Sequence, residues 1–372
     1  MEFTIEKDAF VRALQKIQGI VERRNTMPIL SNVLIEALDD SLTLTATDLE
    51  VGMKSRYQAK VYANGKITIS AKKLYEIIRE LPDEQIKFST RDNDWVDISC
   101  GKAKFNIVGL SPDEFPSFPK IDEKGFISLD SVTLARMIEQ TSYSICHDET
   151  KYNLNGILFK VSDENDERLL RLVATDGHRL CVAEQVIESS SFDILDKGVI
   201  FPKKGIFELK KLCDEEISDI KLGFIDNSVA IVKGNTTVVM RLVDGEFPDY
   251  KRVVPVGNDK EIIIGKELFL HSLKRMAILS SEKFKGIKFE ITNNFMEISS
   301  SNPELGEARE ELEVKYSGDK ITTRFNARYL IDVLNVVTSD DITLLLKDEM
   351  SPAILKQADS DNFLSVIMPM RL

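Results

Sequence analysis

One structural unit occurs three times along this chain. A short alternating strand that runs into an amphipathic helix recurs at intervals of about 125 to 135 residues, in FTIEKDAFVRALQKI, FISLDSVTLARMIEQ and EIIIGKELFLHSLKRM. A second strand-to-helix landmark keeps nearly the same period, in ISAKKLYEIIREL, IFPKKGIFELKKL and TRFNARYLIDVL. Two landmarks that share one period indicate a triplicated domain with two helices in each copy, because a solenoid repeat would be far shorter.

The segments between these helices have the pattern of antiparallel strands. Runs such as SLTLTATDLEVGM and LLRLVATDGHRLCVA alternate or stay apolar and are broken by Asp, Gly and Asn turns. The unit ends also match, since Phe115-Pro116 and Phe247-Pro248 stand at equivalent positions near the ends of the first and second units. We therefore predict an α+β fold of three tandem similar domains over residues 1–122, 123–256 and 257–372, each with two helices and antiparallel sheets.

Composition narrows the class of protein. Of the 372 residues 43% are hydrophobic and 30% are charged, and no apolar run reaches the roughly 18 residues that span a bilayer. The N-terminus MEFTIEKDAF lacks the basic and apolar regions of a signal peptide. We expect a soluble, cytoplasmic protein with no membrane partner.

Metal and disulfide chemistry find little support in the sequence. The four cysteines, Cys100, Cys146, Cys181 and Cys213, stand singly with no CxxC pair, so neither a zinc ribbon nor a disulfide framework is indicated. We expect reduced packing cysteines, no metal and no cofactor.

The stretch Val173 to Ala183, VATDGHRLCVA, looks like a functional site. An enzyme hypothesis would use Asp176 and His178 as an acid/base or metal pair. However, the motifs GxxxxGKS/T, HExxH and GxSxG are absent, and the three histidines, His147, His178 and His271, are far apart in the sequence. We therefore predict a protein with no catalytic residues.

The net charge of −12 argues against a simple nucleic-acid binder, because phosphate binding is driven by Lys and Arg. A protein that surrounds DNA without gripping it needs positive charge on one surface only. The distribution of charge therefore matters more than its sum.

The chain resembles the bacterial DNA polymerase III beta subunits, the sliding clamps of replication, from residue 1 to residue 372. It carries, in the family's order and spacing, the segments RNTMPILSNVLIEA, TATDLE, KYNLNGILF, VATDGHRL, LVDGEFPDYKRVVP, NPELGEAREELEVKYSG and MPMRL. The resemblance implies a head-to-tail homodimer that closes into a ring with helices inside and sheets outside. Such a ring encircles duplex DNA topologically, without sequence preference, and serves DNA replication as the processivity factor of the polymerase.

The resemblance also implies a surface groove for short apolar peptide motifs. Its partners would be the DNA polymerase III alpha subunit, the clamp loader delta subunit, other DNA polymerases and repair proteins. Carried over position by position, the groove comprises Leu154, Thr175, Gly177, His178, Arg179, Leu180, Pro248, Arg252, Val253, Val366, Ile367, Met368, Pro369, Met370, Arg371 and Leu372. In this interpretation His178 and Arg179 form a polar rim and Leu180 forms the apolar floor.

Further positions acquire roles through the same resemblance. It places Arg24, Lys151 and Tyr152 in loops near the duplex, and it turns Lys203 and Lys204 toward the DNA.

The resemblance also sets the subunit contact. It puts Phe105 and Ile107 of one subunit against Ile278 and Leu279 of its partner.

A third class of protein stays open from the residues alone. A triplicated protein-interaction scaffold that does not encircle DNA would suit the charge of −12. Retention on circular DNA separates this alternative from a clamp.

Overall fold

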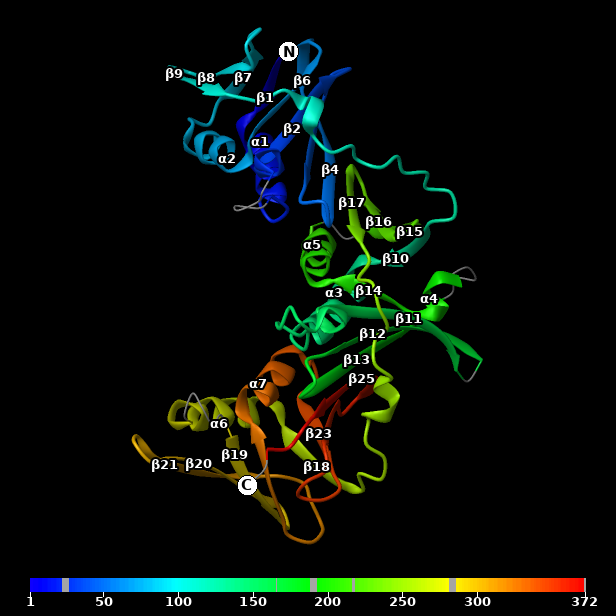
Figure 1. Ribbon diagram of the computed structural model, residues 1–372. Helices are drawn as coiled ribbons and strands as arrows, with labels where there is room; N and C mark the ends of the chain where they lie inside the picture. Colours follow the sequence, from blue (N-terminus) through cyan, green and yellow to red (C-terminus); the bar gives the residue numbers. More distant parts are fainter. Residues whose placement is uncertain (22–26, 165, 188–192, 216–217, 281–285, 371–372) are drawn as a thin grey trace. The chain divides into compact units, whose positions relative to one another are not determined.

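The computed structural model describes residues 1–21, 27–164, 166–187, 193–215, 218–280 and 286–370 (Figure 1). The predicted DNA contact Arg24 and the predicted groove residues Arg371 and Leu372 lie outside the described residues.

Two long helices occur in each of the three repeats, as predicted from the landmarks. The helices are α1 (Lys7–Ile17), α2 (Ala71–Glu80), α3 (Ser131–Ser142), α5 (Lys203–Cys213), α6 (Lys266–Leu279) and α7 (Ala327–Val336), with a short α4 (Asp193–Lys197). Single 3-10 turns are η1 (Pro28–Ser31), η2 (Pro112–Glu114), η3 (Tyr152–Leu154) and η4 (Tyr250–Arg252). Within the described ranges, no helix combines the length and apolarity that a membrane crossing requires.

Helix α1 illustrates how the sequence pattern becomes a packed face. Its buried residues are Phe10, Ala13, Leu14 and Ile17, at the spacing of one side of an α-helix. In the third repeat, α6 and α7 pack against each other and share an aromatic core, in which Phe289 makes edge contacts with Phe269 and Phe325.

The strands form four sheets whose described pairings are all antiparallel. The first sheet has the spatial order β5 (Lys60–Ala63), β1 (Glu2–Glu6), β7 (Gln85–Thr90), β8 (Trp95–Cys100) and β9 (Ala103–Val108). The second has the order β10 (Ile127–Asp130), β15 (Asp219–Ile225), β16 (Ser228–Lys233), β17 (Thr236–Arg241), β4 (Val51–Gln58), β3 (Ser41–Thr47), β2 (Asn32–Leu38) and β6 (Gly65–Ser70).

The other two sheets lie toward the C-terminus. The third has the order β14 (Val199–Pro202), β11 (Gly156–Glu164), β12 (Glu167–Thr175), β13 (Arg179–Val186), β25 (Ser360–Ile367), β24 (Ala353–Gln357), β23 (Asp341–Leu346) and β18 (Lys260–Gly265). The fourth has the order β21 (Gly306–Glu313), β20 (Phe295–Asn302), β19 (Gly286–Thr292) and β22 (Ile321–Asn326).

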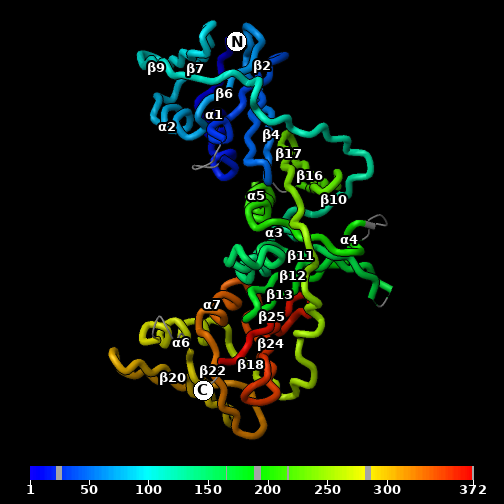
Figure 2. Tube along the Cα trace, viewed as in Figure 1, coloured from blue at the N-terminus to red at the C-terminus, as the bar shows by residue number. Residues whose placement is uncertain are grey.

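Each eight-stranded sheet draws its strands from two neighbouring repeats. In the second sheet β17 pairs with β4, and Val238 lies opposite Met53. In the third sheet β25 pairs with β13 (Figure 2), and the register places Ser365 opposite Cys181. The repeats are therefore joined by continuous ladders of backbone hydrogen bonds as well as by the chain itself.

These shared sheets decide how the chain divides into compact units. One unit comprises residues 1–132 and 207–242, and the other comprises residues 133–206 and 243–372. Each unit keeps one eight-stranded sheet whole, so the division cuts through the middle repeat. The domain boundaries near residues 122 and 256 remain a prediction.

Candidate functional site

The turn between β12 and β13 is built by its own polar side chains. Thr175 Oγ1 donates to the carbonyl of Arg179 at 2.7 Å and accepts the N–H of Gly177 at 3.1 Å. Asp176 Oδ1 accepts the N–H groups of His178 at 2.9 Å and Arg179 at 3.0 Å. Gly177 has φ of +90°, a conformation that favours glycine. TDGH is thus turn chemistry between two paired strands.

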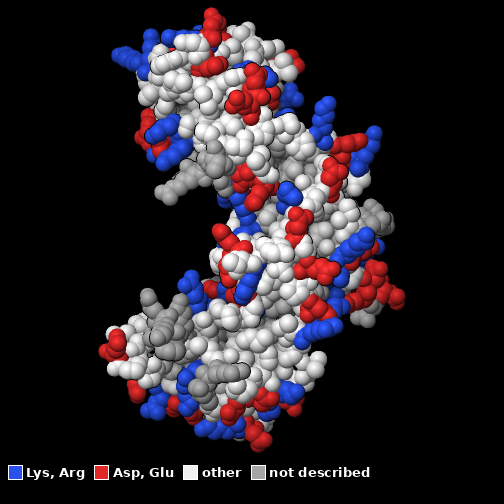
Figure 3. Space-filling model, in the orientation of Figure 1, with Lys and Arg blue, Asp and Glu red and all other residues white. Residues whose placement is uncertain are grey.

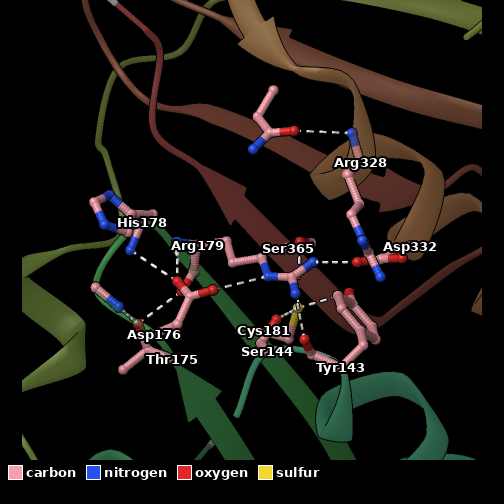
Figure 4. Close-up of polar contacts among 12 residues, drawn as sticks. Tyr143, Ser144, Thr175, Asp176, His178, Arg179, Cys181, Arg328, Asp332 and Ser365 are labelled. Carbon is pink, nitrogen blue, oxygen red and sulfur yellow. Dashed lines mark hydrogen bonds and ion pairs between the residues drawn. The ribbon is translucent and has the colours of Figure 1, made fainter. Parts of the chain in front are cut away.

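This geometry does not favour the enzyme hypothesis. Asp176 Oδ1 accepts a hydrogen bond from the backbone N–H of His178, as Figure 4 shows, and Asp176 Oδ2 accepts one from the Arg179 side chain. In the first repeat Asp48 plays the same part, accepting the N–H groups of Glu50 and Val51. Among the described residues, no three His, Cys, Asp or Glu side chains gather into a group that could hold a metal ion.

Arg179 is buried, which corrects its predicted place on a polar rim. Its side chain is 9% exposed and pairs with Asp176 at 3.1 Å and Asp332 at 2.7 Å (Figure 4). It also donates to the carbonyl of Tyr143, and its guanidinium lies 5.2 and 4.6 Å from the ring centres of Tyr143 and Tyr329. Burial lowers the pKa of Arg179, but Asp332 offsets this, so the pKa is raised overall. Arg179 therefore joins the turn to α3 and α7.

A second polar cluster lies beneath the turn. The Cys181 Sγ atom is 2.6 Å from Tyr143 Oη, 3.0 Å from Ser144 Oγ and 3.3 Å from Ser365 Oγ. Burial raises the pKa of the Cys181 thiol and raises that of the Tyr143 hydroxyl well above its ordinary value. The thiol is thus a packing and hydrogen-bonding group, as predicted for the cysteines of this chain.

An apolar cluster on one face of the third sheet supports the segment after β17. Its buried members are Leu158, Val173, Leu180, Val182, Ile200, Tyr250 and Val366, and Val243, Phe247, Val254 and Leu364 pack around them. The cluster brings two predicted groove stretches, around residues 180 and 366, against a third, residues 243–254.

The same cluster corrects the predicted floor. Leu180 and Val366 are each 1% exposed, and Ile367 is fully buried on the opposite face, in the core of the third repeat. Both faces of β25 are covered, because the apolar cluster packs on one face and the core of the third repeat packs on the other. Exposed apolar surface comes instead from Pro248 and Val253.

The C-terminal tail continues past β25 beside the turn. The N–H of Met368 donates to the carbonyl of His178 at 3.0 Å, and the N–H of Met370 donates to the carbonyl of Arg324 at 2.8 Å. Met368 to Met370 are half-buried. Leu154, at the end of η3, is 9% exposed.

Several residues that complete this site were missed by sequence reasoning. Tyr329 and Asp332 come from α7, and Tyr143 directly follows α3. Their identity as Arg179 partners has no local signal, because Asp332 is 153 residues away from Arg179 in the chain. For Tyr250 the sequence offers one signal, because it lies just after Phe247-Pro248, a pair that also occurs at the end of the first unit.

Four of the predicted DNA-contact residues, Lys151, Tyr152, Lys203 and Lys204, belong to one compact unit. Lys151 is exposed and Tyr152 is 60% exposed at the start of η3. Asn153 Nδ2 donates to the carbonyl of Glu246 at 3.0 Å, which ties this loop to residues 243–254. Lys203 and Lys204 begin α5, and Lys203 Nζ lies 2.5 Å from His147 Nδ1. Their contact with DNA remains a prediction.

The predicted subunit contacts lie on the surface of the chain. Phe105 on β9 is 38% exposed, and Ile107 is half-buried. Ile278 on α6 is 73% exposed, and Leu279 is half-buried. Exposed apolar side chains of this kind are available for an interface.

Removing the Arg179 side chain should destabilise the protein. We expect Arg179→Met to lower the free energy of unfolding by about 2 to 3 kcal/mol, because two carboxylates lose a buried partner. Urea denaturation measures the change. Arg252→Met is the matched control, since Arg252 pairs with Asp249 but is 85% exposed, and it should change stability by less than about 0.5 kcal/mol. Equal stabilities for both variants would contradict the proposed bridging role.

Comparisons with known proteins bear on the whole chain. Three family models match in succession: the DNA polymerase III beta subunit N-terminal domain over residues 1–119, the central domain over residues 128–249 and the C-terminal domain over residues 251–371. The beta sliding clamp of Pseudomonas putida is 37% identical over 374 residues, covering 100% of both chains. The chain belongs to the DNA polymerase III beta subunit family.

Solved structures of this family agree with the fold. The DNA polymerase III beta subunit of Pseudomonas aeruginosa is 36% identical with a TM-score of 0.91, and the Caulobacter crescentus beta sliding clamp is 36% identical with a TM-score of 0.95. A Bartonella birtlesii sliding clamp bound to griselimycin is 34% identical with a TM-score of 0.94. All three match 100% of this chain, and their own chains are covered to 100%, 99% and 100%. The resemblance to the family and the three-domain fold class are confirmed.

Proposed function

We propose that two copies of this chain close head to tail into a sliding clamp around duplex DNA, which tethers the replicative polymerase without catalysing a reaction. Family membership gives the class of protein. The observation that carries the assembly is the strand order, in which two complementary sheet edges have no partner strand among the described residues.

The two free edges are equivalent to strands that already pair. The orders β1-β7-β8-β9, β10-β15-β16-β17 and β18-β23-β24-β25 are counterparts, and so are β6-β2-β3-β4, β14-β11-β12-β13 and β22-β19-β20-β21. Within the chain, the last strands meet as β17 with β4 and as β25 with β13. The remaining last strands are β9 and β21, so a second copy can supply each with its partner. Doing this twice closes a ring, as a heterologous interface requires.

The register of this contact can be stated. Val238 and Ser365 occupy equivalent positions on their strands, and they lie opposite the equivalent residues Met53 and Cys181. The counterpart on β9 is Phe105, since β8 and β9 pair as β16 and β17 do. We therefore infer that Phe105 lies opposite the partner subunit's Ala308. In this arrangement Phe105 and Ile107 meet Ile278 and Leu279 of the partner subunit, as the family resemblance implies.

The edges have the chemistry of a specific seam. Phe105 and Val108 are 38% and 58% exposed on β9. The other edge, β21, reads GEAREELE and is mostly charged. Charged side chains on an exposed edge oppose indiscriminate pairing, so the contact depends on a matched partner.

Peptide docking is the second part of the proposed function. We assign it to the surface around Pro248, Val253 and the tail from Met368, with the TDGH turn, Leu154 and Arg252 at its margins. Two or three apolar anchors, each contributing roughly 1.5 to 3 kcal/mol, suit exchangeable binding near the micromolar range. Methionines in the tail can repack around different peptides. The partners would be polymerases, the clamp loader and repair proteins.

Sparse contact with DNA is compatible with this function. Lys and Arg are intermingled with Asp and Glu on the face that Figure 3 presents. We assign the DNA contacts to Arg24, Lys151, Tyr152, Lys203 and Lys204, while the closed ring, more than contact strength, keeps the protein on the duplex.

The test of this function uses topology. Clamp loaded onto nicked circular DNA by a bacterial clamp loader should co-elute with the circle in gel filtration, and linearising the circle should release most of it. A scaffold that ignores DNA would be absent from the circle before cutting. A protein held by contacts would stay on the DNA after cutting, and either result would contradict the clamp.

A further inference from the structure

Arg171 is an arginine of β12 that the groove assignment does not use. Its side chain is 6% exposed. It donates to Ser162 Oγ at 2.9 Å, to Glu164 Oε1 at 2.7 Å, and also to Glu164 Oε2 and to Glu184 Oε1. Such charge-assisted, forked hydrogen bonds hold their partners in one geometry. The Arg171 cluster, as we call these four residues, is thus a rigid polar block on the sheet.

The position of the cluster on the sheet relates it to the groove. Arg171 pairs across the strands with Lys160 and Glu184, and Val173, two residues along β12, pairs with Val182. Side chains two residues apart on a strand share a face. The Arg171 cluster therefore lies directly beside the apolar cluster that supports residues 243–254.

Two contacts connect the cluster to η4. Lys251 Nζ donates to Glu164 Oε1 at 3.4 Å. Tyr250 is 9% exposed within the apolar cluster, where burial raises its pKa and the nearby charge of Arg171 lowers it. The hydrogen bonds from Arg171 lower the pKa of Glu164 to about 2, so the carboxylate is charged at neutral pH and available to Lys251. These residues of η4 are flanked by the exposed groove residues Pro248 and Val253.

We propose that Arg171 is a positioning residue that holds η4 on the sheet and so fixes one wall of the peptide groove, without touching the peptide. This inference rests on the proposed peptide-docking function. Without Arg171, Glu164 and Glu184 would repel each other, and Lys251 would lose an oriented partner. The wall would sample more conformations, and binding would have to order it again.

The chain contains a matched control. Arg168 lies on the same strand and pairs with Asp196 of α4 at 2.8 Å. Its side chain is 24% exposed, and in the part of the chain that the structure describes it pairs with α4 and not with η4. Arg168→Met removes an ion pair from β12 while leaving the wall of the groove in place.

The experiment compares Arg171→Met, Arg171→Lys and Arg168→Met as full-length dimers. The probe is a fluorescein-labelled peptide from the clamp-binding segment of a bacterial polymerase III alpha subunit, followed by stopped-flow anisotropy. We expect Arg171→Met to raise the dissociation rate constant about tenfold with little change in association, because order is lost in the bound wall. Arg171→Lys should recover part of the effect, and Arg168→Met should match the wild type. Equal effects of the methionine variants, or no effect of Arg171→Met, would overturn the inference.

Hydrogen exchange provides a readout that does not depend on the peptide. Amides of residues 247–254 should exchange faster in Arg171→Met and at the wild-type rate in Arg168→Met. Lys251→Met, an exposed and conservative change, should produce part of the same local increase if Arg171→Met fails to fold. If wild-type protein binds no peptide, the docking function fails, while the exchange result still tests whether Arg171 holds η4 on the sheet. Unchanged exchange at residues 247–254 in Arg171→Met would overturn this positioning role. If Arg171→Met does not fold, unchanged exchange in Lys251→Met would overturn it instead.

Discussion

Phe105→Arg should convert the dimer into a monomer. Phe105 is 38% exposed on β9, the edge that we propose to pair with β21 of a second copy. An arginine there would place an unpaired charge in a closed interface, at a cost of several kcal/mol at each of two seams. Multi-angle light scattering should report half the wild-type mass, and loaded protein should no longer be retained on circular DNA.

The control for this variant lies on the opposite edge of the same sheet. Tyr62 on β5 is 55% exposed, and Tyr62→Arg should leave the mass unchanged. The register can be checked by pairing Phe105→Cys with Ala308→Cys, since the four native cysteines are buried. Oxidation should join two chains. Asn106→Cys with Ala308→Cys should join them poorly, because neighbouring strand residues point to opposite faces. A dimeric Phe105→Arg, or the reverse cross-linking preference, would exclude this seam.

Val253→Glu should abolish peptide binding while leaving the dimer intact. Val253 is 37% exposed beside the buried apolar cluster, so the variant should fold. A bound peptide would have to cover the new carboxylate, which costs a few kcal/mol and at least about a hundredfold in affinity. Fluorescence anisotropy with the alpha-subunit peptide measures the loss.

A neighbouring valine gives the matched control. Val256 is 82% exposed and lies three residues further along, outside the assigned groove. Val256→Glu adds the same charge to the same connection, and its peptide affinity should stay within about twofold of wild type. Comparable losses in both variants would point to a general electrostatic effect. Undiminished binding by Val253→Glu would remove Val253 from the groove.

Much of the fold could be predicted because local patterns repeat. The strand-to-helix landmarks identify the repeats, and the spacing of Phe10, Leu14 and Ile17 predicts a buried helix face that the structure contains. The strand pairings between repeats have no such signal. They are tertiary contacts between segments such as β13 and β25, which are far apart in the sequence.

The errors at the candidate site have a common physical cause. Arg179 was assigned to a polar rim through the family resemblance, but Asp332 and Tyr143 supply partners that stabilise its buried side chain. Val366 and Ile367 were expected to line a groove, yet Val366 packs into the apolar cluster on one face of β25 and Ile367 into the third-repeat core on the other. Long-range partners of this kind decide whether a residue lines a surface or supports it.

The continuous eight-stranded sheets also bear on how such a ring would be forced open. Each junction inside a chain is held twice, by a ladder of hydrogen bonds and by a covalent connection that cannot part. In the proposed dimer, the contact between β9 and β21 would have the ladder alone. A machine that pulls on any part of the ring would therefore concentrate the rupture at one of the two seams. The sheets inside the chain would resist deformation and so return β9 and β21 to the same register after DNA has entered.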